Sequence, residues 1–162
     1  MQENVPAKYL SGIIKEITAK GTPLIKRAYS DWTSSKSLEW RKLLLNYAVT
    51  PIQPYGHVTG NNTCDASIIV DAMDILYSQK VDMFCIVSSY GDFARLATRL
   101  KESDKIVFGF GEKNASDSFK LACDRFILLE NLIVEEAIAK TDIKGGKKVS
   151  GAIFKPIPLS QR

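Results

Sequence analysis

Short apolar segments alternate with amphipathic segments along most of the chain, and this alternation constrains the fold more than any other feature. The clearest apolar segment, residues 83–88, is too short for a helix of its own and is bounded by polar residues, so it predicts a buried strand. The same patterns predict further strands at 23–29, 50–53, 106–110 and 126–129, and helices at 5–20, 35–48, 63–77, 93–101 and 115–122. This order predicts an α/β fold with a parallel sheet covered on both faces.

The first predicted element is a helix, at residues 5–20, because Pro6 suits a first helical turn and Gly21 stands just past the last apolar position. Doubly wound sheets usually begin with a strand, often a central one. The sequence therefore indicates a sheet that lacks its usual first strand. Beyond the last predicted strand the alternation ends, and residues 132–162 predict one more helix followed by a basic linker or tail. We accordingly expect one domain at residues 1–131 and an appendage at 132–162.

The composition is that of a soluble globular protein, with 162 residues, 45% hydrophobic and 25% charged. No apolar run reaches the roughly 18 residues that a membrane span needs, and the first ten residues lack a secretory layout, so we expect a cytoplasmic location and no membrane partner. The three cysteines are widely spaced and form no C-x-x-C pair, so we expect them to be reduced and mostly buried.

The net charge of +4 is unevenly distributed along the sequence. From Lys140 onward there are six basic residues against one acidic residue, Asp142, whereas the preceding part of the chain is close to neutral. Two interpretations of this basic tail stay open: it contacts phosphates, or it is simply solvated.

Two carboxylates are predicted to lie near one edge of the sheet. Asp92 follows the strand at 83–88, and Asp65 lies in the first turn of the preceding helix, where apolar residues three, four and seven positions later turn it toward the sheet. Because sites in open α/β sheets form beyond the carboxyl ends of the strands, we expect these side chains to converge. Such a pair suits Mg²⁺ or Mn²⁺. Alternatively, each aspartate only stabilises the N-terminus of its own helix.

Other polar residues favour structural explanations. Asp71 and Asp74 fall on the opposite helical stripe from Asp65, which indicates a solvated face. His57 is the only histidine, and no serine or cysteine stands in a nucleophile motif such as G-x-S-x-G, so an exposed loop histidine is the preferred interpretation. The glycines of GFGEKN (109–114) match no phosphate-loop pattern and are explained by turns.

Six segments together resemble, in order and spacing, the NYN domains of the PIN-like nuclease superfamily. These segments are ENVPAKYL (3–10), AYSDW (28–32), GNNTCDASIIVDAMDILY (60–77), CIVSSYGDFARLATRLKES (85–103), VFGFGEK (107–113) and LACDRFILLE (121–130). The resemblance implies that residues 1–131 form a three-layer α/β/α, Rossmann-like fold with a mostly parallel central sheet. It also implies metal-dependent cleavage of RNA, with acidic residues holding Mg²⁺ or Mn²⁺ at the strand tips.

The resemblance assigns roles to particular residues. The aspartate that the family carries on a helix falls on Asp65, with Asn62 three residues before it, and the second acid of the S-x-D-x-D-F corner falls on Asp92. The resemblance therefore implies that Asp65 and Asp92 are the catalytic and metal-binding residues. The substrate-binding residues that it implies are Asn4, Asn62, Ser88 and Tyr90.

Two departures from the family pattern concern the same site. Tyr90 stands where the first acid of the corner motif belongs, and Met1 stands where the opening strand of the family ends in an aspartate. A phenol has a pKa of about 10 and stays neutral at pH 7, so it does not replace a carboxylate as a metal ligand. The resemblance thus implies a ribonuclease whose activity is weakened or lost.

Three functional hypotheses stay open from the sequence. The first is a weak Mg²⁺- or Mn²⁺-dependent ribonuclease, and the second is a non-catalytic module that binds single-stranded or structured RNA, or a protein, with the same surface. The third is a fragment of an active longer protein. For the missing strand the sequence also leaves three explanations: the protein extends upstream, the neighbouring strands close up, or another chain, either a partner or a second copy, supplies the strand.

Overall fold

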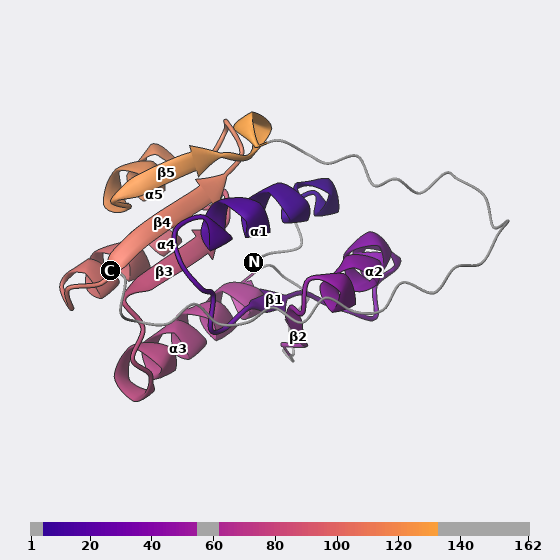
Figure 1. The fold of residues 1–162 in the computed structure, drawn as a ribbon, viewed down its shortest axis with the longest axis horizontal. Helices are drawn as coiled ribbons and strands as arrows, with labels where there is room; N and C mark the ends of the chain where they lie inside the picture. Colours follow the sequence, from indigo (N-terminus) through magenta and orange to yellow (C-terminus); the bar gives the residue numbers. More distant parts are fainter. Residues whose placement is uncertain (1–4, 55–61, 133–162) are drawn as a thin grey trace, which may run out of the picture.

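The computed structural model describes residues 5–54 and 62–132, in which helices and strands alternate (Figure 1). The elements are η1 (Ala7–Tyr9), α1 (Leu10–Thr18), β1 (Arg27–Tyr29), η2 (Ser35–Ser37), α2 (Leu38–Asn46), β2 (Thr50–Ile52), α3 (Asn62–Ser78), β3 (Met83–Val87), α4 (Phe93–Lys101), β4 (Ile106–Gly111), α5 (Asp117–Ala122), β5 (Arg125–Leu128) and η3 (Leu129–Asn131), where η denotes a 3₁₀ helix. Every strand pair among them is parallel. The predicted α/β class is therefore confirmed.

The strands form two sheets. β1 pairs with β2, and β4 lies between β3 and β5. In Figure 1 the three-stranded sheet lies apart from β1 and β2, and no pairing joins β1 to β3 among the described residues. The neighbouring strands have therefore not closed up across the place where a first strand was expected.

The sheets separate two apolar layers, because successive side chains of a strand point to opposite faces. Ile86 of β3 belongs to a cluster that also contains residues of α3, α4 and α5, including Phe93 and Phe119. Its neighbour Val87 belongs to a second cluster, which contains residues of α1 and α2, including Leu10. Helices thus cover both faces, in agreement with the three-layer arrangement.

Several predicted elements are shorter in the structure, most of all those at 5–20 and 23–29. The strand expected at 23–29 is limited to Arg27–Tyr29. Of the residues before it, Lys26 still accepts the N–H of Thr50 through its carbonyl oxygen at 2.9 Å, whereas Pro23 has no N–H to donate. The helix expected at 5–20 begins as η1 and becomes α-helical at Leu10. In contrast, α4 begins and ends where the sequence predicted.

Other expectations concern the whole chain. Cys64, Cys85 and Cys123 are all free, as expected, although only Cys123 is fully buried. In the described ranges no helix has the length and apolar character that crossing a membrane requires. The appendage expected at 132–162 lies, after Leu132, outside the described residues, so the domain boundary stays a prediction, as does the cytoplasmic location.

Candidate functional site

The corner that follows β3 is tied to the neighbouring strand. The N–H of Ser88 donates to the carbonyl oxygen of Phe110 at 2.8 Å, which continues the pairing of β3 with β4. The Ser88 side chain is fully buried, and its Oγ accepts a hydrogen bond from the N–H of Tyr90 at 3.1 Å. Ser88 therefore shapes the turn that leads from the sheet to α4.

The loop after β4 holds the same corner from the other side. Ser89 Oγ accepts the N–H of Glu112 at 3.1 Å, and the Ser89 carbonyl oxygen accepts the N–H of Ser116 at 3.3 Å. A Cβ atom at Gly91 would lie 2.9 Å from Ser116 Oγ, so a larger residue here would require the Ser116 side chain to shift. These contacts give Asp92, the next residue, a defined position at the start of α4.

The charge of Asp92 acts on Asp65. Asp92 is exposed at the N-cap of α4, but its side chain makes no capping hydrogen bond there. Asp65 lies in the first turn of α3 and is 7% exposed. Burial raises the pKa of Asp65, and the negative charge of Asp92 raises it further. The two carboxylates that the sequence singled out are therefore close enough for the charge of Asp92 to act on Asp65, while their role as a site stays a prediction.

One oxygen of this pair has no partner in the part of the chain that the structure describes. Asp65 Oδ1 is buried and accepts no hydrogen bond from residues 5–54 or 62–132. A buried carboxylate oxygen without a partner is costly unless a cation or a donor satisfies it. Mg²⁺ usually binds one or two carboxylates and keeps several waters, so this donor set fits such an ion. Within residues 5–54 and 62–132, however, no cluster of three His, Cys, Asp or Glu side chains could hold a metal.

The predicted substrate-binding residues have different surroundings. Tyr90 is half-buried and packs against the apolar cluster that contains Phe93, so the protein covers part of its ring. The hydroxyl of Ser88 accepts the N–H of Tyr90 within the corner. Asn62 is the first residue of α3, and Asn4 lies outside the described residues, as does His57.

The sequence interpretation of Asp71 was wrong. Asp71 was expected on a solvated face, but its Oδ2 accepts hydrogen bonds from Arg27 Nη1 at 2.7 Å and from Tyr29 Oη at 2.6 Å. Burial, followed by the hydrogen bond to Asp71, raises the pKa of Tyr29 above its ordinary range. Arg27 and Tyr29 are two positions apart in β1, so their side chains lie on the same face of the strand. This spacing is the one sequence signal that indicates a shared partner. Asp74 is exposed, as expected.

The parallel sheets with helices on both faces form an α/β fold of the kind that PIN-like nuclease domains have. The family model of the NYN domain matches residues 2–130, which is most of the chain. The chain therefore belongs to the NYN domain family, a family of PIN-like nucleases associated with RNA and generally dependent on divalent metals. No curated protein matches the sequence.

Proposed function

We propose that this NYN domain binds RNA beside Asp65 and Asp92 and cleaves its phosphodiester bonds slowly, with Mg²⁺ or Mn²⁺ held by these two aspartates. The observation that carries the proposal is the buried, unpartnered Oδ1 of Asp65, close enough to Asp92 for the charge of one to act on the pKa of the other. A buried carboxylate oxygen without a hydrogen bond destabilises the fold, so its presence favours a functional role.

The residues of the site have distinct roles in this proposal. Asp65 and Asp92 supply the negative charge that attracts a divalent ion, and Ser88 fixes the corner on which Asp92 stands. Asn62, the first residue of α3, is assigned the role of orienting a phosphate or a water. A bound divalent ion supplies charge neutralisation and an activated water for phosphodiester hydrolysis.

The activity should be low because Tyr90 replaces an acid of the family motif. A neutral phenol does not offset the charge of a divalent ion, so we expect weaker metal binding than three or four carboxylates would give. Loss of a single catalytic group commonly lowers the rate by about 10²-fold or more.

An RNA cleavage assay with Mn²⁺ tests the proposal. We expect the full chain to cut a labelled single-stranded RNA slowly, and the Asp65→Ala and Asp92→Ala variants to fall by about 10²-fold or to background. The matched control is Asp74→Ala, because Asp74 is an exposed aspartate of the same helix. If Asp65→Ala cleaves RNA as fast as the unchanged chain, the assignment of the site is wrong.

The alternative function is RNA binding without cleavage, which the replacement of an acid by Tyr90 favours. Tyr90 is only half-buried, so part of its ring remains available for stacking on a base. We expect fluorescence anisotropy to show RNA binding that weakens when salt rises from about 50 to about 200 mM, and that weakens for Tyr90→Ala but not for Tyr90→Phe. Absence of salt-sensitive binding would exclude this alternative.

A further inference from the structure

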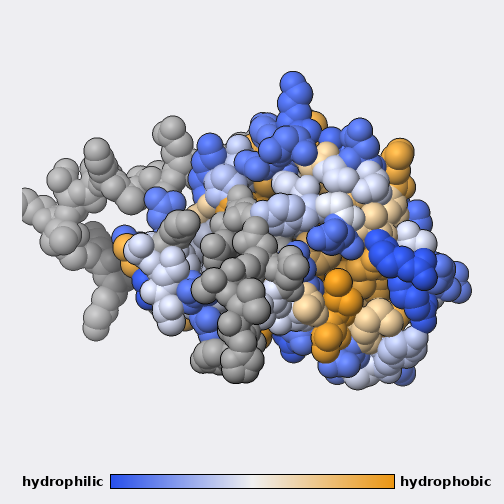
Figure 2. All heavy atoms as spheres, turned by 180° about the vertical axis from the view of Figure 1, so that it is seen from behind, coloured by the Kyte–Doolittle hydropathy of each residue, from blue (hydrophilic) through white to orange (hydrophobic). Residues whose placement is uncertain are grey.

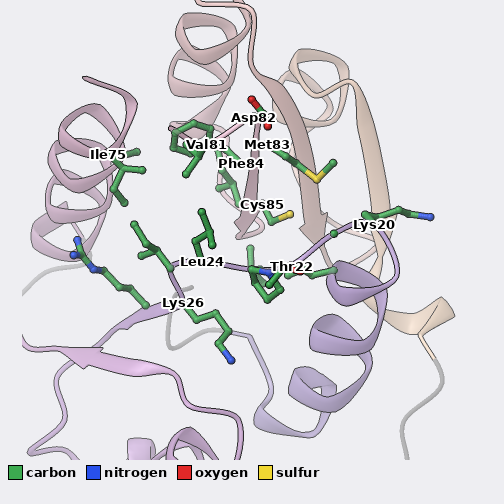
Figure 3. Close-up of a pocket in the computed structure, with 18 of the residues that line it drawn as sticks. Lys20, Thr22, Leu24, Lys26, Ile75, Val81, Asp82, Met83, Phe84 and Cys85 are labelled. Atoms are coloured by element: carbon green, nitrogen blue, oxygen red, sulfur yellow. The ribbon is translucent and has the colours of Figure 1, made fainter. Parts of the chain in front are cut away.

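The groove between β1 and β3 does not include the two candidate carboxylates. It has a volume of about 450 Å³ and is bordered by residues 20–27 and 80–87 (Figure 3). Neither Asp65 nor Asp92 lines this groove. A ligand bound at the two aspartates would therefore contact other surface, and α4, which follows Asp92 directly, contributes to that surface.

α4 carries three basic side chains, and two of them have partners within the protein. Arg99 donates hydrogen bonds to the hydroxyls of Tyr77 and Ser103, and Lys101 pairs with Asp124 at 3.1 Å. Both basic residues lie in the last turn of the helix, where a cation interacts favourably with the helix dipole. Contacts within the fold thus account for Arg99 and Lys101.

The third basic side chain, Arg95, lies at the opposite end of α4. It is exposed and forms no hydrogen bond or ion pair with residues 5–54 or 62–132. Arg95 is the third residue of the helix, where the positive end of the helix dipole disfavours a cation and where glutamate is the common capping residue. The charge of Arg95 therefore does not stabilise α4, and this favours a role outside the fold.

Arg95 lies three residues after Asp92, which stands at the N-cap of α4 in helical geometry. Residues at this spacing are neighbours on a helix surface, with Cβ atoms about 5–6 Å apart. Lys120 and Asp117 of α5 form an ion pair over the same spacing, at 3.4 Å. Among the described residues Arg95 and Asp92 form no such pair, so the guanidinium stays available to a ligand beside the carboxylate.

Position, and not exposure, distinguishes Arg95 from other surface arginines. In the space-filling view from behind, hydrophilic side chains cover much of the surface and border a smaller apolar area (Figure 2). Arg41 and Arg125 are exposed as well, but Arg41 lies on α2 and Arg125 begins β5. Because parallel strands begin at the edge opposite their carboxyl ends, Arg125 lies far from the strand tips. Of these three arginines, only Arg95 stands one helical turn from a candidate metal ligand.

A guanidinium in this position suits a phosphate. Its N–H groups can donate two parallel hydrogen bonds to phosphate oxygens, and it stays charged throughout the pH range in which proteins fold. Phosphate oxygens are also common ligands of a divalent ion held by carboxylates. Arg95 and the two aspartates therefore suit the same ligand, a polymer whose backbone consists of phosphodiesters.

We propose that Arg95 binds a phosphate of the RNA backbone beside Asp92 and so holds the strand at the two aspartates. The inference rests on the proposed function in taking RNA as the ligand of this edge, and it applies to cleavage and to binding alone. A guanidinium attracts a phosphate directly. This contact therefore does not need the metal charge, whose binding the replacement of an acid by Tyr90 weakens.

Arg95→Gln tests the phosphate contact. The affinity for a fluorescently labelled oligouridylate is measured by anisotropy in EDTA, so that metal-dependent cleavage does not interfere. We expect the variant to bind about tenfold more weakly than the unchanged chain. The slope of log affinity against log salt concentration should fall by about 0.7, the value for one phosphate contact with a single strand.

Two further variants serve as controls. Arg95→Lys keeps the charge but not the paired hydrogen bonds, so it should keep the salt slope and lose less affinity than Arg95→Gln. Arg125→Gln removes the same charge at the opposite edge of the sheet, and we expect it to change the affinity by less than about twofold.

The stability of Arg95→Gln separates binding from a structural role. Glutamine has a helix propensity similar to that of arginine, and the substitution removes a cation from the first turn of α4. We therefore expect the midpoint of urea unfolding to stay the same or to rise while the affinity for RNA falls. A residue that only supports the helix would lower both.

Three outcomes would overturn the inference. They are equal affinity and salt slope of Arg95→Gln and the unchanged chain, weaker affinity together with a lower midpoint, and absence of binding by the unchanged chain at about 50 mM salt. If Arg95→Gln binds normally while Asp65→Ala loses cleavage, the inference alone is wrong. If Arg95→Gln loses affinity while Asp65→Ala cleaves as fast as the unchanged chain, the phosphate contact stands and the assignment of the carboxylates is wrong.

Discussion

At the scale of the residue, Asp65 combines a stability cost with a proposed function. Its Oδ1 is buried without a partner among the residues that the structure describes, and both burial and the charge of Asp92 raise its pKa. A carboxyl whose pKa is raised on folding lowers the stability of the fold at pH values above its folded pKa. It has no such effect below its unfolded pKa of about 3.8, because both states are then protonated. Residues that serve a function commonly lower the stability of the fold in this way.

Asp65→Asn should therefore stabilise the protein when no metal is added. We expect urea unfolding in EDTA at pH 7 to show a gain of about 1 kcal/mol, since the amide is neutral and its burial costs less. The gain should shrink toward pH 4 as the carboxyl of the unchanged chain takes up its proton. Added Mn²⁺ should raise the midpoint of the unchanged chain but not that of the variant. A loss of stability in EDTA would contradict this account of Asp65.

At the scale of the element, the corner between β3 and α4 depends on close backbone contacts with the loop that follows β4. A Cβ atom at Gly111 would lie 2.5 Å from the carbonyl oxygen of Ser88, which is backbone and cannot rotate away. Ser89 is held by the same loop through Glu112 and Ser116. Asp92 thus takes its position from contacts between segments more than twenty residues apart in sequence.

Gly111→Ala should displace this corner. We expect a loss of about 2 kcal/mol in the free energy of unfolding, together with weaker protection by Mn²⁺ because Asp92 moves with the corner. Gly21→Ala is the control, because a Cβ atom at Gly21 meets no atom within 4 Å, and it should change stability by less than about 0.5 kcal/mol. Equal stability of the two variants would show that the corner tolerates the added atom.

At the scale of the whole molecule, the division of the sheet is the main feature. Among residues 5–54 and 62–132, the two parallel sheets share their helical layers but no backbone pairing joins them, and an apolar groove separates β1 from β3. The ion pair of Arg27 with Asp71 and the hydrogen bond of Tyr29 to Asp71 connect the smaller sheet to α3. Side-chain contacts of this kind hold the two parts together where backbone pairing is absent.

The sequence by itself determined the local elements, the α/β class and the two aspartates. Strand and helix periods are local signals, so α4 was predicted at both ends, and the spacing of Asp65 from its apolar neighbours fixed its direction toward the sheet. Only the tertiary structure decided that Asp71 binds Arg27 and Tyr29, that Tyr90 is half-buried against the core, and that β1 is limited to three residues. These outcomes depend on which segments become neighbours in space, because a hydrogen-bond partner or a missing strand partner leaves no regular spacing in the sequence.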